Sequence, residues 1–531
     1  MKLLAMIRLG DDILTSFRES KAIPNGRQIL VLAIVFFIFL FLCVRTISIG
    51  MSGHGQKRTF SPGAIKITRA DIVDRNGEIL AKNIYAFDLF LDAHKIKDSD
   101  RAANFVHSVV PEISAAEVIA KIETGKRNIE IKKDIGRDVE AAVKNEKIDG
   151  ISAVLKQVRK YPKNNLMSHV VGFVNRDGRG ADGVEKSEDE RLRAIGEPLV
   201  LSIDSRIQSE MRTQLGAAMK EYGTKAALGI LMNARTGEIL AMVSLPDFDP
   251  ENIGGFPREN LTSKIRFHNY EMGSIFKIFN TALALSHGMP VERTFNVADP
   301  FIISGRPVAE ARGFKPPAKN LNLEQIMQYS SNSGSAQIAL ALPDGAQIEF
   351  FKELYFNRPL ETDFGMTAGT IFPKSFTPTD RSRWAFGQGI SVTPLHALLA
   401  ANAIVNDGKY IMPTIYKRDF VPAVRQVVSK EVSKKLRGIM LKVMDTSGRA
   451  AAVQIHFIKV GGKTSTAQKS IGGKYSDTKN ITAFFSTFPI EAPKWSMLII
   501  LDEPEGNPRT AAYNAVPVSG KIIDAVAPLL N

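Results

Sequence analysis

Two polar residues three positions apart, Ser274 and Lys277, stand just before an apolar run that ends at Gly288. Glycine commonly ends a helix, so the run predicts a helix with Ser274 near its N-terminus. Residues three apart share one helix face, with Cβ atoms about 5 to 6 Å apart. A neutral Lys277 could take the Ser274 proton, and the helix dipole would favour the alkoxide. The pair indicates a serine nucleophile with a lysine base.

The spacing alone is weak evidence, because Ser476 and Lys479 repeat it beside glycines in a predicted solvated loop. Two further polar segments follow Ser274 in order. YSSNSG, at 329–334, lies between two helical patterns, and VGGKTSTA, at 460–467, follows a strand-like run. Three polar segments in a fixed order are far more specific than one pair.

The order S-x-x-K, S-x-N, K-T-G resembles the signature of penicillin-binding proteins and serine β-lactamases. Here it reads Ser274 and Lys277, Ser330 and Asn332, and Lys463 and Thr464, with Ser465 in the glycine position. Four more stretches resemble class B penicillin-binding proteins, at 69–77, 183–186, 386–395 and 501–504. The resemblance covers the N-terminal apolar run and nearly all of residues 60–531.

This resemblance implies a monofunctional peptidoglycan D,D-transpeptidase that uses no cofactor and no metal ion. Its substrates would be stem peptides, and β-lactams would be covalent inhibitors. Ser274 would attack the penultimate D-alanine carbonyl, and an amine of a neighbouring stem would take the acyl group. Lys463 would lower the pKa of Lys277 by like-charge repulsion. Ser330 would relay a proton to the leaving amine, and Asn332 would hold the substrate backbone.

The K-T-G segment would supply the remaining contacts. Backbone N–H groups of Ser274 and Thr466 would bind the oxyanion. Lys463, Thr464 and Thr466 would bind the terminal carboxylate of the substrate. Ser465 departs from the pattern, since a glycine there would let the substrate lie against the strand. A degenerate site is one interpretation; because every other motif residue is present, we expect the serine to be tolerated in the binding strip.

Two other functions share the motif triple. A β-lactamase or β-lactam sensor is one, but no E-x-x-L-N pattern follows Asn332 to activate a deacylating water. A scaffold with a decayed site is the other. The eight histidines show no H-x-x-x-H or H-E-x-x-H spacing, so we expect no metal site.

Strand and hairpin patterns surround these motifs. A strand-like run at 199–204 precedes a helix that Gly223 closes, and hairpin patterns follow at 227–245 and near the C-terminus at 483–501. Strands at both ends of a helix-rich segment predict an α+β fold, an antiparallel sheet flanked by helices in which the two hairpins meet. The resemblance implies the same fold, that of the penicillin-binding and serine β-lactamase-like transpeptidase domain.

An uncharged run of sixteen residues, 29–44, is too short at about 24 Å to cross a membrane unless it continues to Ile49 with Arg45 snorkelling. More basic residues precede the run than follow it: Lys2, Arg8, Arg18, Lys21 and Arg27 against Arg45, Lys57 and Arg58. The positive-inside rule then predicts a cytoplasmic tail at 1–28, one span at 29–49 and a periplasmic remainder, in the bacterial inner membrane. A cleavable signal peptide is the alternative, disfavoured by the long leader with Asp11 and Asp12.

The composition fits this arrangement. The chain has 531 residues, a net charge of +14 and one cysteine, Cys43, which excludes a disulfide framework and a cysteine-based zinc site. No block of more than two Lys or Arg residues supports nucleic-acid binding.

Residues 50–195 carry no catalytic cluster and form a predicted non-catalytic pedestal or dimerisation-like module, and 196–531 form the transpeptidase domain. The length and the 501–523 stretch resemble the septal enzymes of Gram-negative bacteria; an elongation enzyme is the alternative. By resemblance, the partners would be a membrane glycan polymerase of the SEDS family and other divisome proteins.

Overall fold

The structure is a computed structural model of the whole chain. The residues that it describes are 30, 33–43, 45, 69–194, 196–311, 316–372, 376–418, 420, 422–445, 458–506 and 509–530. The chain divides into two compact units, residues 1–66 and residues 67–531. The predicted cytoplasmic tail at 1–28 lies outside the described residues.

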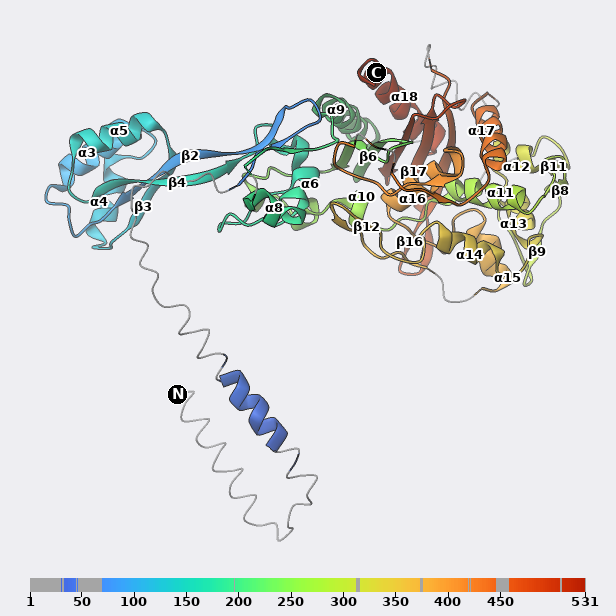
Figure 1. Cartoon of the computed structure of the whole chain (residues 1–531), viewed down its shortest axis with the longest axis horizontal. Coiled ribbons are helices and arrows are strands. Elements are labelled where there is room, and N and C mark those ends of the chain that lie inside the picture. The colour runs from blue at the N-terminus through green and yellow to red at the C-terminus, as the bar shows by residue number, and fades with distance from the viewer. Residues whose placement is uncertain are drawn as a thin grey trace, which may run out of the picture. The chain divides into compact units, whose positions relative to one another are not determined.

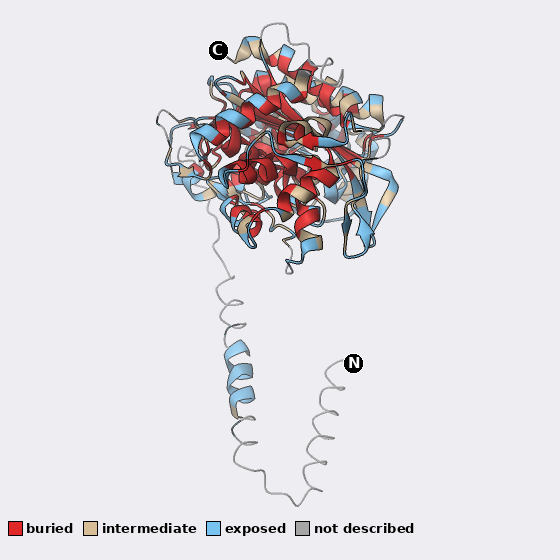
Figure 2. Ribbon diagram, turned by 90° about the vertical axis from the view of Figure 1, so that its right-hand side faces the viewer, coloured by how far each residue is buried: buried red, intermediate tan, exposed pale blue. Residues whose placement is uncertain are grey.

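In the first unit, residues 33–43 are helical and expose most of their large apolar side chains (Figure 2). Across the described residues, we find no helix that combines the length and the apolar character needed to cross a membrane. The predicted span at 29–49 is described only at Leu30, 33–43 and Arg45, and its remaining positions lie outside the described residues.

A five-stranded sheet organises the N-terminal module of the second unit (Figure 1). Its strands are β1 (Ile72–Val73), β2 (Ile79–Leu91), β3 (Ile129–Ile135), β4 (Ile151–Lys160) and β5 (Leu199–Val200). The long strand β2 pairs antiparallel with β1, β3 and β4, while β5 runs parallel to β1. Gly77 turns the chain between β1 and β2 with a φ of +89°, a conformation that glycine adopts readily.

Three helices form a small core with this sheet, α3 (Ser99–Val109), α4 (Ala115–Glu123) and α5 (Arg137–Glu146). Leu89 of β2 and Ile131 of β3 pack there against Val106, Val118 and Val143. The module therefore has an apolar core separate from the one around the predicted site.

Short helices lead from this module toward the second sheet, namely η1 (Asn164–Met167), α6 (Ser168–Val171), α7 (Gly183–Ser187) and α8 (Asp189–Ala194). Two of the motifs singled out in the sequence meet here. Arg69 Nε donates to Glu185 Oε2 at 2.5 Å, and Arg159 Nε donates to Glu185 Oε1 at 2.7 Å. All three side chains are buried. The two ion pairs therefore hold Arg69, just before β1, and Arg159 of β4 against helix α7, which precedes the second sheet.

The second sheet is antiparallel and carries the K-T-G strand at its edge. Its strands, in spatial order, are β16 (Gly461–Ile471), β17 (Lys474–Phe488), β18 (Trp495–Asp502), β6 (Ala226–Asn233) and β7 (Ile239–Leu245). Trp495 pairs with Asn233, and Asp502 pairs with Ala226. The prediction that the first and last hairpins meet in one sheet is confirmed.

Helices cover both faces of this sheet. Side chains alternate along a strand, so Met497 and Ile499 of β18 pack with Ile207 of α9 (Ser205–Tyr222) and with α18 (Ala515–Val526). Leu498 and Ile500 face the other core, which contains α11 (Phe276–Ser286) and α16 (Pro394–Val405). Figure 2 colours much of these central elements as buried. The predicted helix after residue 204 is confirmed as α9, and Gly223 caps it in the left-handed conformation.

The remaining elements are short or lie around the periphery of this domain: η2 (Ile253–Gly255), η3 (Arg258–Leu261), α10 (Lys264–Phe267), η4 (Gly273–Ile275), β8 (Thr294–Asn296), β9 (Ile302–Ile303), β10 (Arg306–Pro307), β11 (Asn320–Asn322), α12 (Leu323–Tyr329), α13 (Asn332–Leu340), α14 (Ala346–Glu353), β12 (Glu361–Thr362), β13 (Gly365–Met366), α15 (Pro378–Trp384), β14 (Lys409–Tyr410), β15 (Arg425–Gln426), α17 (Lys430–Asp445), η5 (Ala511–Tyr513) and η6 (Ala527–Leu529).

Candidate active site

Ser274 lies in the turn η4, directly before helix α11. Gly273 opens this turn with a φ of +49°, a left-handed conformation that residues with side chains rarely adopt. Ser274 is half-buried, while Phe276 and nearly all of α11 belong to the core. The helix ends at Ser286, at the end of the apolar run. A rigid core helix therefore holds the predicted nucleophile at its N-terminus.

The structure brings Ser274, Lys277, Ser330 and Asn332 together. Lys277 Nζ donates to Ser274 Oγ at 3.1 Å and to Asn332 Oδ1 at 2.8 Å. Nζ also lies within hydrogen-bond distance of two Ser330 atoms, the carbonyl oxygen at 2.5 Å and Oγ at 3.1 Å, so its protons are shared among four acceptors. Ser330 Oγ donates to Ser274 Oγ at 2.9 Å. The two hydroxyls and the amine therefore form a connected path for a proton.

The local backbone conformation determines where the residues of the S-x-N segment point. Ser330 ends α12 in the left-handed conformation, with a φ of +59°, and Ser331 caps the next helix, α13. A non-glycine residue in this conformation is strained and often marks a functional site. The reversal between the two helices points Ser330 and Asn332 at the same lysine.

The electrostatics favour a neutral Lys277. Its side chain is 1% exposed. Burial, and next the charge of Lys463, hold the pKa of Lys277 well below its usual 10.5, while Glu310 acts in the opposite direction. A lysine with a depressed pKa is available as a base at neutral pH.

Strand β16, which carries the K-T-G segment, lies beside this cluster. Lys463 is buried, and its Nζ donates to Ser330 Oγ and to the Thr464 carbonyl oxygen, both at 3.1 Å. Thr466 is exposed, and its Oγ1 accepts from the backbone N–H of Ala511 at 3.0 Å. By strand alternation, Thr464 and Thr466 project from the face opposite Lys463. Their contact with a substrate carboxylate stays a prediction.

Ser465 points toward the nucleophile turn. Its side chain is 3% exposed, and a Cβ at Gly273 would lie 2.5 Å from Ser465 Oγ. Among the described residues, Oγ has no hydrogen-bond partner. The serine that replaces the motif glycine therefore fills space behind Gly273, and its tolerance in the active site stays a prediction.

The 386–395 segment buttresses the same turn. A Cβ at Gly387 would lie 2.3 Å from the Gly273 carbonyl oxygen, so only glycine allows this approach. The backbone N–H of Gly389 donates to Glu271 Oε1 at 3.0 Å, and Tyr475 Oη donates to the same oxygen at 3.1 Å. These contacts tie two segments, 386–395 and the start of β17, to the residues just before Ser274.

Glu310 is a site residue that sequence reasoning missed. Its carboxylate accepts from the Asn332 backbone N–H at 2.7 Å. Nothing in the spacing indicates it, because Glu310 stands alone in a loop more than twenty residues before Asn332 and belongs to none of the quoted motifs.

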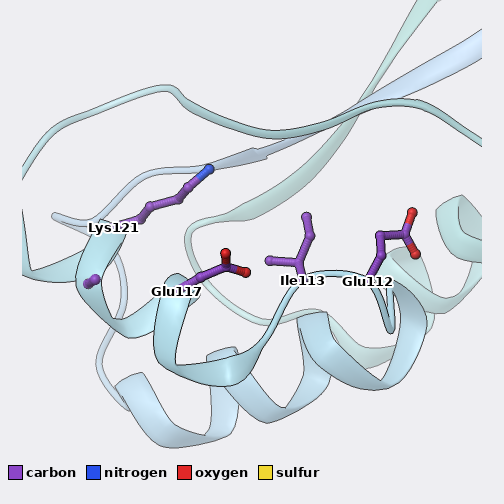
Figure 3. Close-up of a pocket in the computed structure, with 5 residues that line it drawn as sticks. Glu112, Ile113, Glu117 and Lys121 are labelled. Atoms are coloured by element: carbon purple, nitrogen blue, oxygen red, sulfur yellow. The ribbon is translucent and has the colours of Figure 1, made fainter.

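Within the described ranges, no group of three or more His, Cys, Asp or Glu residues could hold a metal ion. A surface cavity of about 420 Å³ lies in the N-terminal module, next to α4 (Figure 3). Its Glu112 pairs with Lys132 at 2.6 Å, and its Glu117 caps α4 through Ser114. The cavity contains none of the predicted site residues.

Comparisons with known proteins agree with this geometry. Residues 227–525 match the family described as "Penicillin binding protein transpeptidase domain", and residues 64–198 match "Penicillin-binding Protein dimerisation domain". The chain is 29% identical over 521 residues to "Probable peptidoglycan D,D-transpeptidase FtsI" of Caulobacter vibrioides, covering 93% of this chain and 87% of the relative. It is 24% identical over 544 residues to "Peptidoglycan D,D-transpeptidase FtsI" of Escherichia coli K12, covering 94% and 90%.

The fold is also found among solved structures. Penicillin Binding Protein 2X from Streptococcus thermophilus superposes with a TM-score of 0.74 at 20% identity, covering 87% of this chain and 79% of that one. This likeness concerns the fold alone.

Proposed function

The chain belongs to the penicillin-binding protein transpeptidases, and from this membership we propose that it cross-links peptidoglycan through a Ser274 acyl-enzyme during septum formation. It is a peptidoglycan D,D-transpeptidase with a D-Ala-D-Ala substrate. The roles of the residues and the cellular setting are our proposal.

The first step is attack by Ser274. Its Oγ bonds to the carbonyl carbon of the penultimate D-alanine while its proton passes to neutral Lys277, 3.1 Å away. Burial and Lys463 support this role, because both favour the neutral amine. A positioned base typically accelerates such a step by roughly 10²- to 10⁴-fold. The backbone N–H groups of Ser274 and Thr466 would stabilise the oxyanion, each by roughly 3 kcal/mol.

The second step expels the terminal D-alanine. Its C–N bond breaks, and the leaving amine takes the proton that Lys277 had accepted. We expect Ser330 Oγ to relay that proton, because it lies 2.9 Å from Ser274 Oγ and 3.1 Å from the Nζ atom of Lys277. The amine of a second stem peptide then attacks the ester, loses a proton by the same route and regenerates Ser274. The product is a cross-link in place of the terminal D-alanine.

The observation that carries the proposal is the contact of Lys277 Nζ with both Ser274 Oγ and Asn332 Oδ1. Fluorescent penicillin should label the wild-type protein, and Ser274→Ala should abolish the label. Ser476→Ala is the matched control, because it changes the other S-x-x-K pair, where Lys479 pairs with Glu503. Full labelling of Ser274→Ala would refute the assignment.

The lifetime of the penicillin adduct separates transpeptidase from hydrolase. An adduct on Ser274 that lasts hours fits a transpeptidase, because no deacylating water is activated. Turnover within seconds, followed as released penicilloate, would instead identify a β-lactamase.

The septal role rests on relatives. Two proteins similar over more than nine-tenths of this chain carry the name of a D,D-transpeptidase FtsI. We expect residues 29–49 to anchor the chain in the inner membrane with the catalytic domain in the periplasm, and a SEDS-family polymerase and other divisome proteins to be its partners. Depletion should make cells filament; rounded cells would indicate elongation instead.

A further inference from the structure

A short segment of the loop after β10 lies over the S-x-N turn. Glu310 Oε1 accepts from Ser331 Oγ at 2.6 Å and from the Ser333 backbone N–H at 2.9 Å. Glu310 Oε2 accepts from the Asn332 backbone N–H at 2.7 Å. One carboxylate therefore takes three hydrogen bonds from three consecutive residues of the motif.

These contacts stabilise a strained turn. The N–H groups of Asn332 and Ser333 open α13, where the helix itself offers no acceptors, and a carboxylate there also complements the helix dipole. Hydrogen bonds to a charged group are stronger than neutral ones. They offset the unfavourable left-handed conformation of Ser330, next in the chain.

The same segment orients the Asn332 amide. Asn332 Nδ2 donates to the Ala309 carbonyl oxygen at 2.9 Å, while Oδ1 accepts from Lys277 Nζ at 2.8 Å. The two contacts fix which end of the amide faces the lysine. The amide has two N–H donors, so one remains for a substrate carbonyl while Ala309 keeps the other.

Glu310 also bears on the charge of the base. The charged groups that act on Lys277 are Lys463, from β16, and Glu310, from this loop. The hydroxyls of Ser274 and Ser330 complete the surroundings of Nζ. Removing the Glu310 charge would leave Lys463 unopposed and make Lys277 neutral at lower pH.

We propose that Glu310 is a positioning residue for transpeptidation, which holds the Ser330 to Asn332 turn against Lys277 and orients the Asn332 amide for the stem peptide. The proposal rests on the proposed roles of Ser274 and Lys277. Wild-type protein that takes no penicillin label would defeat those roles, whereas the variants below test Glu310 alone.

The test is the pH profile of acylation by fluorescent penicillin in stopped flow, from about pH 5 to about pH 10, a range that brackets a lysine base with a lowered pKa. We expect Glu310→Gln to lower the plateau rate by about tenfold or more, since its amide cannot accept all three bonds. We also expect its acidic limb to move to lower pH. Glu310→Asp keeps the charge and should leave the limb in place while lowering the plateau. Asp299→Asn is the control. Among the described residues, the exposed Asp299 side chain pairs with Asn296 and Lys319, so its change should alter neither the plateau rate nor the acidic limb.

Two results would overturn the proposal. A Glu310→Gln plateau within about twofold of wild type would remove the positioning role, since a lost charged hydrogen bond costs more than that. If Glu310→Gln lowers the plateau rate of acylation but leaves the acidic limb of the pH profile in place, Glu310 has a purely structural role. If thermal melting shows that Glu310→Gln is unfolded, Glu310→Asp decides, and an unchanged plateau rate in that variant refutes the proposal.

Discussion

The close packing of Gly273 and Ser465 behind the nucleophile can be tested by filling and emptying the space between them. Gly273→Ala adds a Cβ that would lie 2.5 Å from Ser465 Oγ and 3.1 Å from Ala467 Cβ, at a backbone φ of +49°. A left-handed conformation costs a residue with a side chain about 1 to 2 kcal/mol. Overpacking a tight site adds about 1 to 3 kcal/mol. Since the turn carries Ser274, we expect acylation by penicillin to slow by about a hundredfold, which corresponds to about 2.7 kcal/mol.

Ser465→Gly alone has opposing effects. It removes a buried hydroxyl without a described partner, which relieves about 1 to 3 kcal/mol, and adds backbone freedom that costs about 0.5 to 1 kcal/mol. The Ser465 hydroxyl is buried and points toward Gly273, so we expect the acylation rate to change by less than about tenfold, or 1.4 kcal/mol.

The double variant Gly273→Ala with Ser465→Gly separates the two costs. Removing the Ser465 hydroxyl relieves the overpacking but leaves the φ strain at position 273. The double variant should therefore be acylated about tenfold faster than Gly273→Ala. Stopped-flow acylation of the four proteins gives the coupling, and thermal melting confirms that each is folded. A double variant no faster than Gly273→Ala refutes the packing argument, and a thousandfold gain in Ser465→Gly refutes the tolerance of serine.

Two stability predictions concern the N-terminal module. Glu185→Gln removes the charged partner of buried Arg159 and leaves Arg69 paired with Asp189 alone. It should lower the free energy of unfolding in urea by about 3 kcal/mol. The exposed change Glu190→Gln should alter that free energy by less than about 0.5 kcal/mol, and equal effects of the two variants would contradict the prediction. Burial raises the pKa of Asp74, but hydrogen bonds from Ser205, and from backbone N–H groups nearby, outweigh it and hold the pKa below 3.8. This stabilisation is fully present above the pKa of Asp74 in the unfolded chain, and it is lost as the pH falls through the lower pKa of the folded protein. Asp74→Asn should therefore make the free energy of unfolding in urea fall less steeply with pH below about pH 4. An unchanged dependence of that free energy on pH would count against the prediction.

Local patterns predicted several of the elements that surround the motifs. Gly223 indicates where α9 ends, and the hairpin patterns indicate β6, β7, β17 and β18 because the side chains that face the two cores are apolar. The cluster of Ser274, Lys277 and Ser330 was expected from the resemblance to penicillin-binding proteins, which implies that the three motifs share one active site. The ion pair between Arg69 and Glu185, 116 positions apart, could not be predicted from the sequence, because it depends on the fold that encloses both side chains.

The protonation of Lys277 shows where sequence reasoning ends. Like-charge repulsion from Lys463 was predictable, since both lysines belong to motifs that converge. The larger effect is burial, which depends on the packing of all of α11 and is visible only in the fold. The opposing charge of Glu310 depends on a loop segment that reaches the first N–H groups of α13. A carboxylate that shapes the S-x-N turn also makes the base harder to deprotonate, so the site combines a firmly held Asn332 with a base pKa that lies above what burial and Lys463 alone would give.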